Sequence, residues 1–398
     1  MKRYRSLNLI IIILIIFVLS LLFISCKQDP STLRTYRPPE NINDGLSVGS
    51  LEEANINQAL IEKAVNGIDR GKYGEVHSIL IYKDGKLVVE EYFTGHKYQW
   101  DAPNSHGDLV TFTKSTQHFA HSVSKSFTSI CIGIAVDKGF IQSVNQSIFD
   151  YLPEHQNLNT DGKDRITIEH LLTMTPGLQW DEWNAPYTSL ENDMGKMWFA
   201  CEDPIFCALI NPLISEPGTS FTYNGGGIVL LGEILKNATG TDIDEFSKKY
   251  LFEPLGTDSY DWELIFENGV IDTAGGLKVT PRDMAKIGAT FLDNGIFNGK
   301  QIISEQWIEK SATPYQGNTR IKLPGEDFGK VGYAYTWWTR EFSISGKKIN
   351  GFWANGWAGQ KIMVFPEMDL VVVFTGGNYT SNNHNLKILE KYIFPAIE

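Results

Sequence analysis

HSVSKSFTSICIGIAVDKG, residues 121–139, is the stretch that decides how this chain is organised. It begins with a polar segment that contains Ser122 and Lys125, and it continues into the almost wholly apolar run SFTSICIGIAV. Such a run predicts a helix that enters the core, and Gly139 is a typical residue for ending it. The lysine at its start either lies on a rim in water or is buried with a partner, because burying an unpaired charge is costly.

The spacing of Ser122 and Lys125 suggests a catalytic pair. Residues three apart share one face of a helix, and free N–H groups in the first turn favour a developing oxyanion. A serine hydroxyl needs a neighbour to take its proton, and a desolvated lysine with a lowered pKa can do so. The pattern alone also fits a helix cap with a lysine that reaches solvent. A second copy, Ser345–Lys348, lies in a predicted strand–turn–strand, and we expect it to be structural.

The regions on either side predict an α+β fold. Residues 50–65 have helical spacing, and residues 77–95 are two β-rich runs joined by the turn Lys83–Lys86. Residues 333–377 return to strands before a final helix. We therefore expect an antiparallel sheet flanked by helices and formed from both ends of the chain, with a mostly α-helical region inserted at roughly residues 120–290. The site should lie where the two regions meet.

The N-terminus predicts export. MKRYR supplies positive charge, residues 7–25 are apolar, and Cys26 follows at a site that resembles a lipoprotein cleavage site. Residues 1–26 are therefore interpreted as a signal with lipidation at Cys26, residues 27–50 as a linker, and residues 51–398 as the folded domain. The alternative is an uncleaved anchor, since the run is about long enough to span a bilayer. Both readings place the domain outside the cytoplasm, attached to a membrane in the cell envelope.

Composition excludes several functions. The chain of 398 residues is 42% hydrophobic, which is enough for a large core, and its net charge of −12 argues against a nucleic-acid partner. Cys131 should be a buried thiol, whereas Cys201 and Cys207 could close a short disulfide that their spacing alone does not establish. The eight histidines look scattered, and no zinc spacing, phosphate loop or dinucleotide fingerprint stands out. We expect no metal and no cofactor.

Several motifs together resemble the serine β-lactamase and penicillin-binding protein superfamily. They are HSVSKSFTS, ITIEHLLTMTPGL, FTYNGGGIVLLGEIL, TAGGLKVTPRDMAKIG and GWAGQKIMVFP, in this order, and the resemblance covers roughly residues 75–395. The branch that looks most similar is the class C-like one, which includes esterases and amide hydrolases. The resemblance implies the sheet-and-helices fold sketched above and a covalent acyl-enzyme on Ser122.

Two further motifs of that superfamily have counterparts here. Tyr223 matches the tyrosine of Tyr-x-Asn, and the resemblance implies that it shares proton transfer with Lys125; the alternative is a packed aromatic. The family's asparagine is replaced by Gly225. Asn224 could serve instead, although it could equally be a simple turn residue.

The third motif is matched by Ala354, Asn355 and Gly356, followed by Trp357. The resemblance implies that the N–H of Trp357 joins that of Ser122 in binding the oxyanion, and that Gly356 lets substrate approach the strand. The alternative is a glycine-rich turn between strands.

The departures bear on the substrate. Gly225 and Ala354 stand where β-lactamases and D,D-peptidases hold the substrate's amide and carboxylate, so we expect a metal-independent esterase or amidase acting on another small acyl compound. Four tryptophans suggest an apolar acyl pocket, or else they are ordinary core residues: Trp337, Trp338, Trp353 and Trp357. A β-lactamase or D,D-peptidase remains the alternative within the fold, and a catalytically inactive envelope-binding protein is the alternative from another class.

Overall fold

A computed structural model describes residues 33–397, and the chain from Arg37 onward forms one compact unit. The expected signal segment and Cys26 lie outside the described residues. Within residues 33–397, none of the helices combines the length and apolarity that a bilayer crossing requires.

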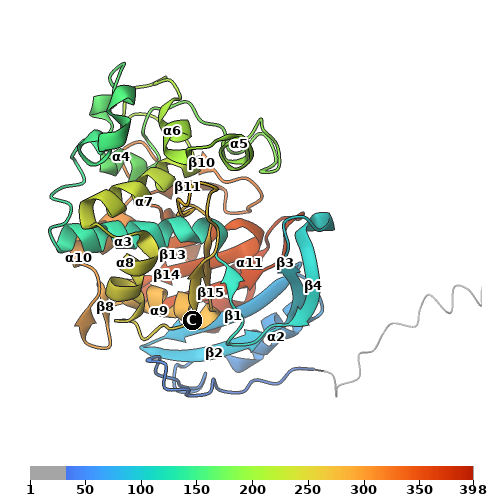
Figure 1. The fold of residues 1–398 in the computed structure, drawn as a ribbon. Helices are drawn as coiled ribbons and strands as arrows, with labels where there is room; N and C mark the ends of the chain where they lie inside the picture. Colours follow the sequence, from blue (N-terminus) through green and yellow to red (C-terminus); the bar gives the residue numbers. More distant parts are fainter. Residues whose placement is uncertain (1–32, 398) are drawn as a thin grey trace, which may run out of the picture. The chain divides into compact units, whose positions relative to one another are not determined.

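An eight-stranded antiparallel sheet forms the centre of the unit that begins at Arg37 (Figure 1). The two strands from the N-terminal part of the chain form a hairpin whose first strand pairs with the last strand of the sequence, so the sheet is built from both ends as expected. In spatial order the strands are β10 (Ile321–Lys322), β11 (Lys330–Tyr333), β12 (Trp338–Ile344), β13 (Lys347–Gly356), β14 (Gln360–Phe365), β15 (Leu370–Gly376), β1 (Val76–Lys83) and β2 (Lys86–Tyr92).

Local sequence signals explain several of these elements. Asp84 and Gly85 have φ values of 50° and 79°, which suit the two-residue turn that joins β1 to β2. The side chain of Thr280 accepts a hydrogen bond from the N–H of Asp283 and caps α9, and Pro281 occupies the first helical position.

Helices cover both faces of the sheet. A Cβ on Gly288 of α9 would lie 2.3 Å from Val371, which faces the same side as Ile362, so α9 packs tightly on that face. The ring of Phe394 contacts Phe365, whose side chain points to the opposite face. The flanking helices are α2 (Gln58–Asp69), α9 (Pro281–Leu292), α10 (Glu305–Ala312), α11 (Asn385–Ile388) and α12 (Phe394–Ile397).

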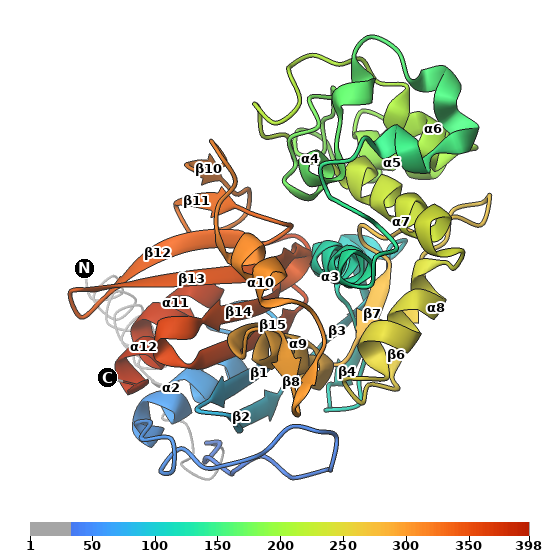
Figure 2. The ribbon, with the colours of Figure 1, turned by 90° about the vertical axis from the view of Figure 1, so that its left-hand side faces the viewer.

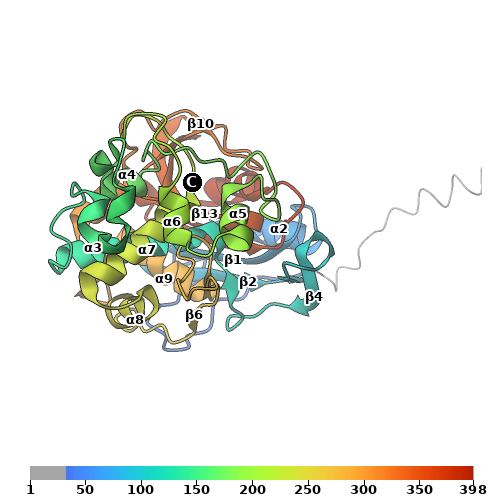
Figure 3. The same cartoon turned by 45° about the horizontal axis from the view of Figure 1, so that its top comes forward.

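A mostly helical region follows the short strand β5 (His118–Phe119) and lies to one side of the sheet, with α4–α7 grouped together (Figures 2 and 3). Its helices are α3 (Ser124–Asp137), α4 (Ile168–Leu172), α5 (Asp193–Ala200), α6 (Pro204–Leu209), α7 (Gly225–Thr239) and α8 (Ile243–Ser247). Three small sheets accompany it: β3 (Thr94–Tyr98) with β4 (His106–Thr111), β5 with β7 (Leu277–Val279) and β6 (Tyr260–Trp262), and β8 (Ile296–Phe297) with β9 (Lys300–Gln301).

Part of the segment expected to be a linker packs on this unit. Leu87 exchanges backbone hydrogen bonds with Ser47 and Gly49, and Leu46 is buried. Buried Arg282 pairs with Asp44 at 3.0 Å, so a long-range charge partner, which local composition does not reveal, fixes these residues.

The cysteines separate into two kinds. Cys201 and Cys207 form a disulfide, and Cys131 is the buried free thiol that the sequence suggested. The thiol lies in α3, where nearly every residue is buried, and α3 packs against α7 and α8.

Candidate active site

Ser122 lies in a single 3-10 turn, His121–Val123, that leads directly into α3. The sequence predicted that Ser122 lies in the first turn of the α-helix. It lies instead in the 3-10 turn that precedes that helix. His121 adopts a left-handed φ of 47°, which turns the chain sharply between β5 and the helix. The N–H of Ala120 donates to Leu277 O at 2.8 Å, and Ser124 Oγ accepts from Leu277 N–H at 3.2 Å. The segment that carries Ser122 is therefore fastened to β7 on both sides.

Lys125 is buried and held by specific partners. Its side chain is 4% exposed, and Nζ lies 3.1 Å from Ser122 Oγ and donates to Ala274 O at 2.9 Å. Of the two alternatives that the sequence left open, the buried one is correct. The buried amino group therefore lies within hydrogen-bond reach of the half-buried Ser122 hydroxyl, as a serine–lysine pair requires.

Tyr223 is the third member of this group. Lys125 Nζ lies 5.1 Å from the centre of the Tyr223 ring, and that ring stacks between Trp183 and Trp338 at 5.3 and 6.1 Å. Burial and the charge of Glu182 raise the pKa of Tyr223 by more than the charge of Lys125 and hydrogen bonding with Ser122 and Lys125 lower it, so the net direction is upward. The phenol is thus coupled to both members of the serine–lysine pair.

The pKa of Lys125 shifts in the opposite direction from the one the sequence suggested. Burial lowers the pKa of Lys125, but Tyr223 and the carboxylates of Glu182 and Asp272 outweigh burial, so the pKa is raised above its ordinary value. Lys125 is therefore an ammonium at neutral pH in this structure. Its charge favours a phenolate on Tyr223 rather than making the amine itself a free base.

Glu182 is a site residue that sequence reasoning missed. Its buried carboxylate accepts hydrogen bonds from the Trp180 indole at 2.8 Å, from Gly225 N–H at 2.6 Å and from the Tyr187 hydroxyl at 3.0 Å. A Cβ on Gly225 would lie 2.7 Å from Met194 Sδ and 3.0 Å from Glu182 Oε2. The position that carries asparagine in the superfamily motif therefore has no room for a side chain here. The available signal was an acidic residue in the tryptophan-rich segment 180–183, WDEW.

Sequence reasoning also missed Asp272, whose carboxylate holds a loop that contacts Lys125. Its buried Oδ1 accepts from the N–H groups of Ala274 and Gly275 at 2.8 and 3.1 Å. These bonds hold the loop whose carbonyl, Ala274 O, receives Lys125. Burial raises the pKa of Asp272, whereas Lys125 and the two N–H donors lower it, and the net direction is upward.

The third motif lies beside the serine as the resemblance implied. A Cβ on Gly356, at the end of β13, would lie 2.3 Å from Ala120 O. The chain's own backbone, two residues before Ser122, therefore comes close enough to Gly356 to require glycine there. Trp357 follows, 38% exposed, with its ring 5.4 Å from that of His121. Its backbone N–H is thus carried close to the segment of the nucleophile.

The asparagines and remaining tryptophans have structural partners. Asn224 caps α7, because its Oδ1 accepts from Gly227 N–H at 2.8 Å, so its side-chain oxygen is already in use. Asn355 Oδ1 accepts from the ammonium of buried Lys361, which pairs with Glu326 at 2.7 Å. The tryptophans Trp337, Trp338 and Trp353 are buried in the core, whereas partly exposed Trp183 lies on Tyr223 and was not anticipated.

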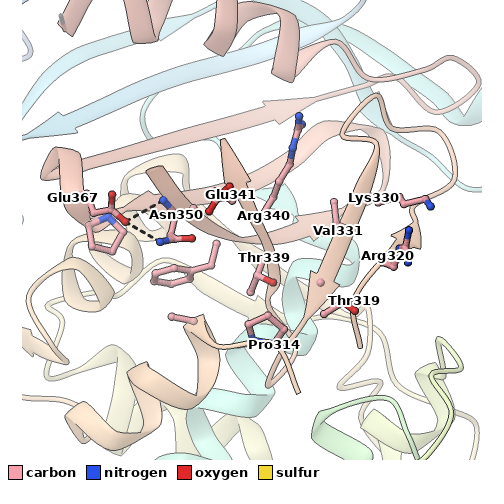
Figure 4. Close-up of a pocket in the computed structure, with 15 residues that line it drawn as sticks. Pro314, Thr319, Arg320, Lys330, Val331, Thr339, Arg340, Glu341, Asn350 and Glu367 are labelled. Carbon is pink, nitrogen blue, oxygen red and sulfur yellow. Dashed lines mark hydrogen bonds between the residues drawn. The ribbon is translucent and has the colours of Figure 1, made fainter. Parts of the chain in front are cut away.

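A separate hollow of about 480 Å³ lies over β11, β12 and β13 (Figure 4). Arg320, Lys330 and Glu341 contribute to its wall, and Glu367 binds Asn350 at its edge. Ser122, Lys125 and Tyr223 do not line it. This hollow is therefore distinct from the candidate active site.

Known proteins resemble this chain in sequence. The family model described as Beta-lactamase matches residues 76–385. The 6-aminohexanoate-dimer hydrolase of Paenarthrobacter ureafaciens is 25% identical over 272 residues, a match that covers 66% of each chain and thus just under two thirds of that enzyme.

Solved structures support the same fold. A protein from Bacillus anthracis assigned as a 6-aminohexanoate-dimer hydrolase superposes with a TM-score of 0.64 at 21% identity, covering 93% of this chain and 89% of that one. A family VIII carboxylesterase superposes with a TM-score of 0.63 at 16% identity, covering 84% and 96%.

Proposed function

Because the chain belongs to the Beta-lactamase family of serine hydrolases, we propose that it cleaves a small ester or amide through a covalent acyl-enzyme on Ser122. One observation carries the proposal: buried Lys125 Nζ lies 3.1 Å from Ser122 Oγ, with the Tyr223 ring against the same nitrogen. Burying the charge of Lys125 costs desolvation free energy, and a helix can be capped without a buried charge. The contact with Ser122 therefore favours a chemical role.

The proposed chemistry follows from the charges. The reactive form carries Tyr223 as a phenolate, which the ammonium of Lys125 favours; Ser122 Oγ attacks the carbonyl carbon and its proton passes to that phenolate oxygen, leaving a phenol. The N–H groups of Ser122 and Trp357 bind the oxyanion. Tyr223 returns the proton to the leaving alcohol or amine as the carbonyl re-forms. Water then attacks the acyl-enzyme by the same route and releases the acid, so no metal takes part in the chemistry.

The substrate is a small acyl compound other than a penicillin. Gly225 has no room for a side chain and Ala354 is buried, so neither position offers the recognition groups that the superfamily's penicillin binders use. The similarity to a 6-aminohexanoate-dimer hydrolase favours an amide substrate. The similarity to the fold of a carboxylesterase supports an ester as the other substrate class. β-Lactamase or D,D-peptidase activity remains the alternative.

The decisive experiment labels the purified domain with a fluorophosphonate and then screens p-nitrophenyl esters, linear amides, D-amino-acid amides and nitrocefin. We expect one label on Ser122 and turnover of an ester or amide. Ser122→Ala should abolish both without a change in Tm, while Ser345→Asn, in the second Ser-x-x-Lys copy at the exposed β12–β13 turn, should retain both. Rapid turnover of nitrocefin would favour the alternative, and a wild-type protein without any label would favour the inactive binding protein.

We also propose that the domain is exported and attached to a membrane through lipid on Cys26. The apolar segment before Cys26 motivates this, and the Cys201–Cys207 disulfide suits an oxidising compartment. Metabolic labelling with radioactive palmitate should mark the wild-type protein and not Cys26→Ala. Membrane attachment of Cys26→Ala equal to that of the wild type would favour the uncleaved anchor instead.

A further inference from the structure

Histidines that look scattered in the sequence converge in the fold. His77 in β1, His96 in β3, His106 in β4 and His118 in β5 are joined by ring contacts, with His77 5.3 Å from His118 and His96 4.3 Å from His106 between ring centres. The pairing of β3 with β4 and the folding of this hairpin onto β1 bring them together. No local spacing announces this group, because each residue comes from a different strand.

Two of these histidines and Glu75 form a compact donor set. One nitrogen of His96, one nitrogen of His106 and one carboxylate oxygen of Glu75 all lie within 4.8 Å of one another. His96 Nδ1 is 3.0 Å from Glu75 Oε2, and the two imidazole rings stack almost parallel, 4° apart, so one ring must rotate for both nitrogens to face a single ion. The register of β3 against β4 shifts between His96 and Tyr98, a kind of irregularity that re-aims side chains. All three residues are partly exposed, so solutes can reach them.

The carboxylate is fixed from behind by a buried histidine. His77, which is 1% exposed, places Nε2 3.0 Å from Glu75 Oε1, and the N–H of His96 also donates to that oxygen. Asn378 holds the backbone of Glu75 through two hydrogen bonds, at 2.8 and 3.2 Å. Such outer partners orient the ligands of metal sites in proteins.

Two glycines make the space for this arrangement. A Cβ on Gly95 would lie 2.6 Å from His77 Cδ2, and a Cβ on Gly377 would lie 2.5 Å from Glu75 Oε1. Any other residue at these positions would push the carboxylate or the buried histidine away. The backbone therefore bounds the side of the site that faces His77.

We propose that Glu75, His96 and His106 bind one divalent transition-metal ion of the zinc type, which fastens the β3–β4 hairpin to the main sheet. Two imidazole nitrogens and one carboxylate oxygen are a donor set that zinc prefers, with a fourth position left for water. Calcium and magnesium are disfavoured because they select oxygen ligands. The alternative occupant of the same space is a proton shared between Glu75 and His96.

The location gives the ion a structural role. The His106 ring lies 5.8 Å from that of Tyr379, which in turn lies 5.3 Å from that of Trp357 beside the candidate active site. Tyr98, opposite His106 in the hairpin, contacts both His121 and Trp357. An ion that holds the hairpin therefore orders this aromatic wall and takes no part in the chemistry at Ser122.

Metal binding by tag-free protein tests the proposal. The domain is stripped with EDTA, dialysed against metal-free buffer and titrated with Zn²⁺ by calorimetry, with elemental analysis of the dialysed complex. We expect one zinc per chain and a higher Tm with zinc than with EDTA. Glu75→Gln, His96→Ala and His106→Ala should each weaken binding at least about tenfold, and His77→Gln should do so by about 10- to 100-fold through orientation alone. His384→Gln, outside the group, should bind like the wild type.

Cobalt provides a second measurement that does not depend on stability. Co²⁺ bound by the wild type should show visible absorption bands that His96→Ala lacks, in samples with the same far-ultraviolet circular dichroism. Binding of less than 0.2 zinc per chain, or equal binding by the wild type and by Glu75→Gln, would overturn the proposal. Fluorophosphonate labelling of Ser122 in the EDTA-treated protein keeps this result separate from the proposed hydrolase activity.

Discussion

The N–H of Gly225 donates a 2.6 Å hydrogen bond to Glu182 Oε2, and this bond places a buried carboxylate beside the serine–lysine–tyrosine group. Glu182 raises the pKa of both Lys125 and Tyr223. The carboxylate thereby replaces a neutral amide of the superfamily motif with a negative charge. A site with this charge distribution should favour substrates that are neutral or positively charged near the reacting carbonyl.

Glu182→Gln should shift the pH dependence of hydrolysis towards acid. Removing the negative charge removes an influence that raises the pKa of Tyr223 and of Lys125, so the phenolate forms at lower pH. The acidic limb of the kcat/KM profile should therefore move to lower pH, measured with a chromogenic ester. A limb that stays in place, or moves to higher pH, would mean that Glu182 does not act on the proton-transfer pair.

Gly225→Asn restores the residue of the superfamily motif and should still harm the protein. The new side chain would meet Met194 Sδ and Glu182 Oε2, so the free energy of unfolding should fall by about 1–3 kcal/mol. Gly139→Asn is the matched control, because its Cβ meets nothing within 4 Å and asparagine tolerates its φ of 76°. Urea unfolding measures both variants. A Gly225→Asn protein as stable as this control, and newly acylated by fluorescent penicillin, would contradict the explanation.

Lys125→Ala should slow hydrolysis by orders of magnitude at neutral pH and by less at high pH. The charge of Lys125 lowers the pKa of Tyr223, so without it the phenolate forms only at higher pH and the acidic limb of the profile moves up. Lys348→Ala, in the exposed second copy of the motif, should leave the profile unchanged. A defect that is constant across the whole pH range would indicate that Lys125 positions Ser122 and does not influence its base.

The sequence predicted those parts of the fold that depend on local signals. The Asp84–Gly85 turn and the end of α3 just before Gly139, whose φ is 76°, each depend on a backbone geometry that neighbouring residues alone determine. The antiparallel sheet from both chain ends followed from the order of these elements together with the superfamily resemblance.

The rest depended on contacts between residues far apart in the sequence. Tyr223, Glu182 and Asp272 together set the sign of the Lys125 pKa shift; the two carboxylates lie 57 and 147 residues from Lys125 along the chain, and no periodicity connects them with it. The histidine group also arises from strand pairing. The close approach of Gly356 to the carbonyl of Ala120 likewise joins residues that are far apart in the sequence.

Arg282→Ala should be among the more destabilising single changes, because it leaves charges buried. The guanidinium pairs with Glu90 at 2.7 Å and with Asp44 at 3.0 Å, and the Glu90 side chain is only 6% exposed. Breaking a buried pair by removing one partner costs about 3–5 kcal/mol. The exposed pair Arg165–Glu216 is the matched control, and Arg165→Ala should cost less than about 1 kcal/mol.

Urea unfolding at neutral pH measures these variants together with the double variant Arg282→Met/Glu90→Gln. The double variant should recover part of the loss, because it leaves no unpaired carboxylate at position 90. Limited proteolysis should also cut Arg282→Ala within residues 40–50, since Arg282 Nη2 donates to Glu40 O at 2.7 Å and holds that segment in place. Equal losses of stability in Arg282→Ala and Arg165→Ala would show that the buried pair contributes no more than a surface pair.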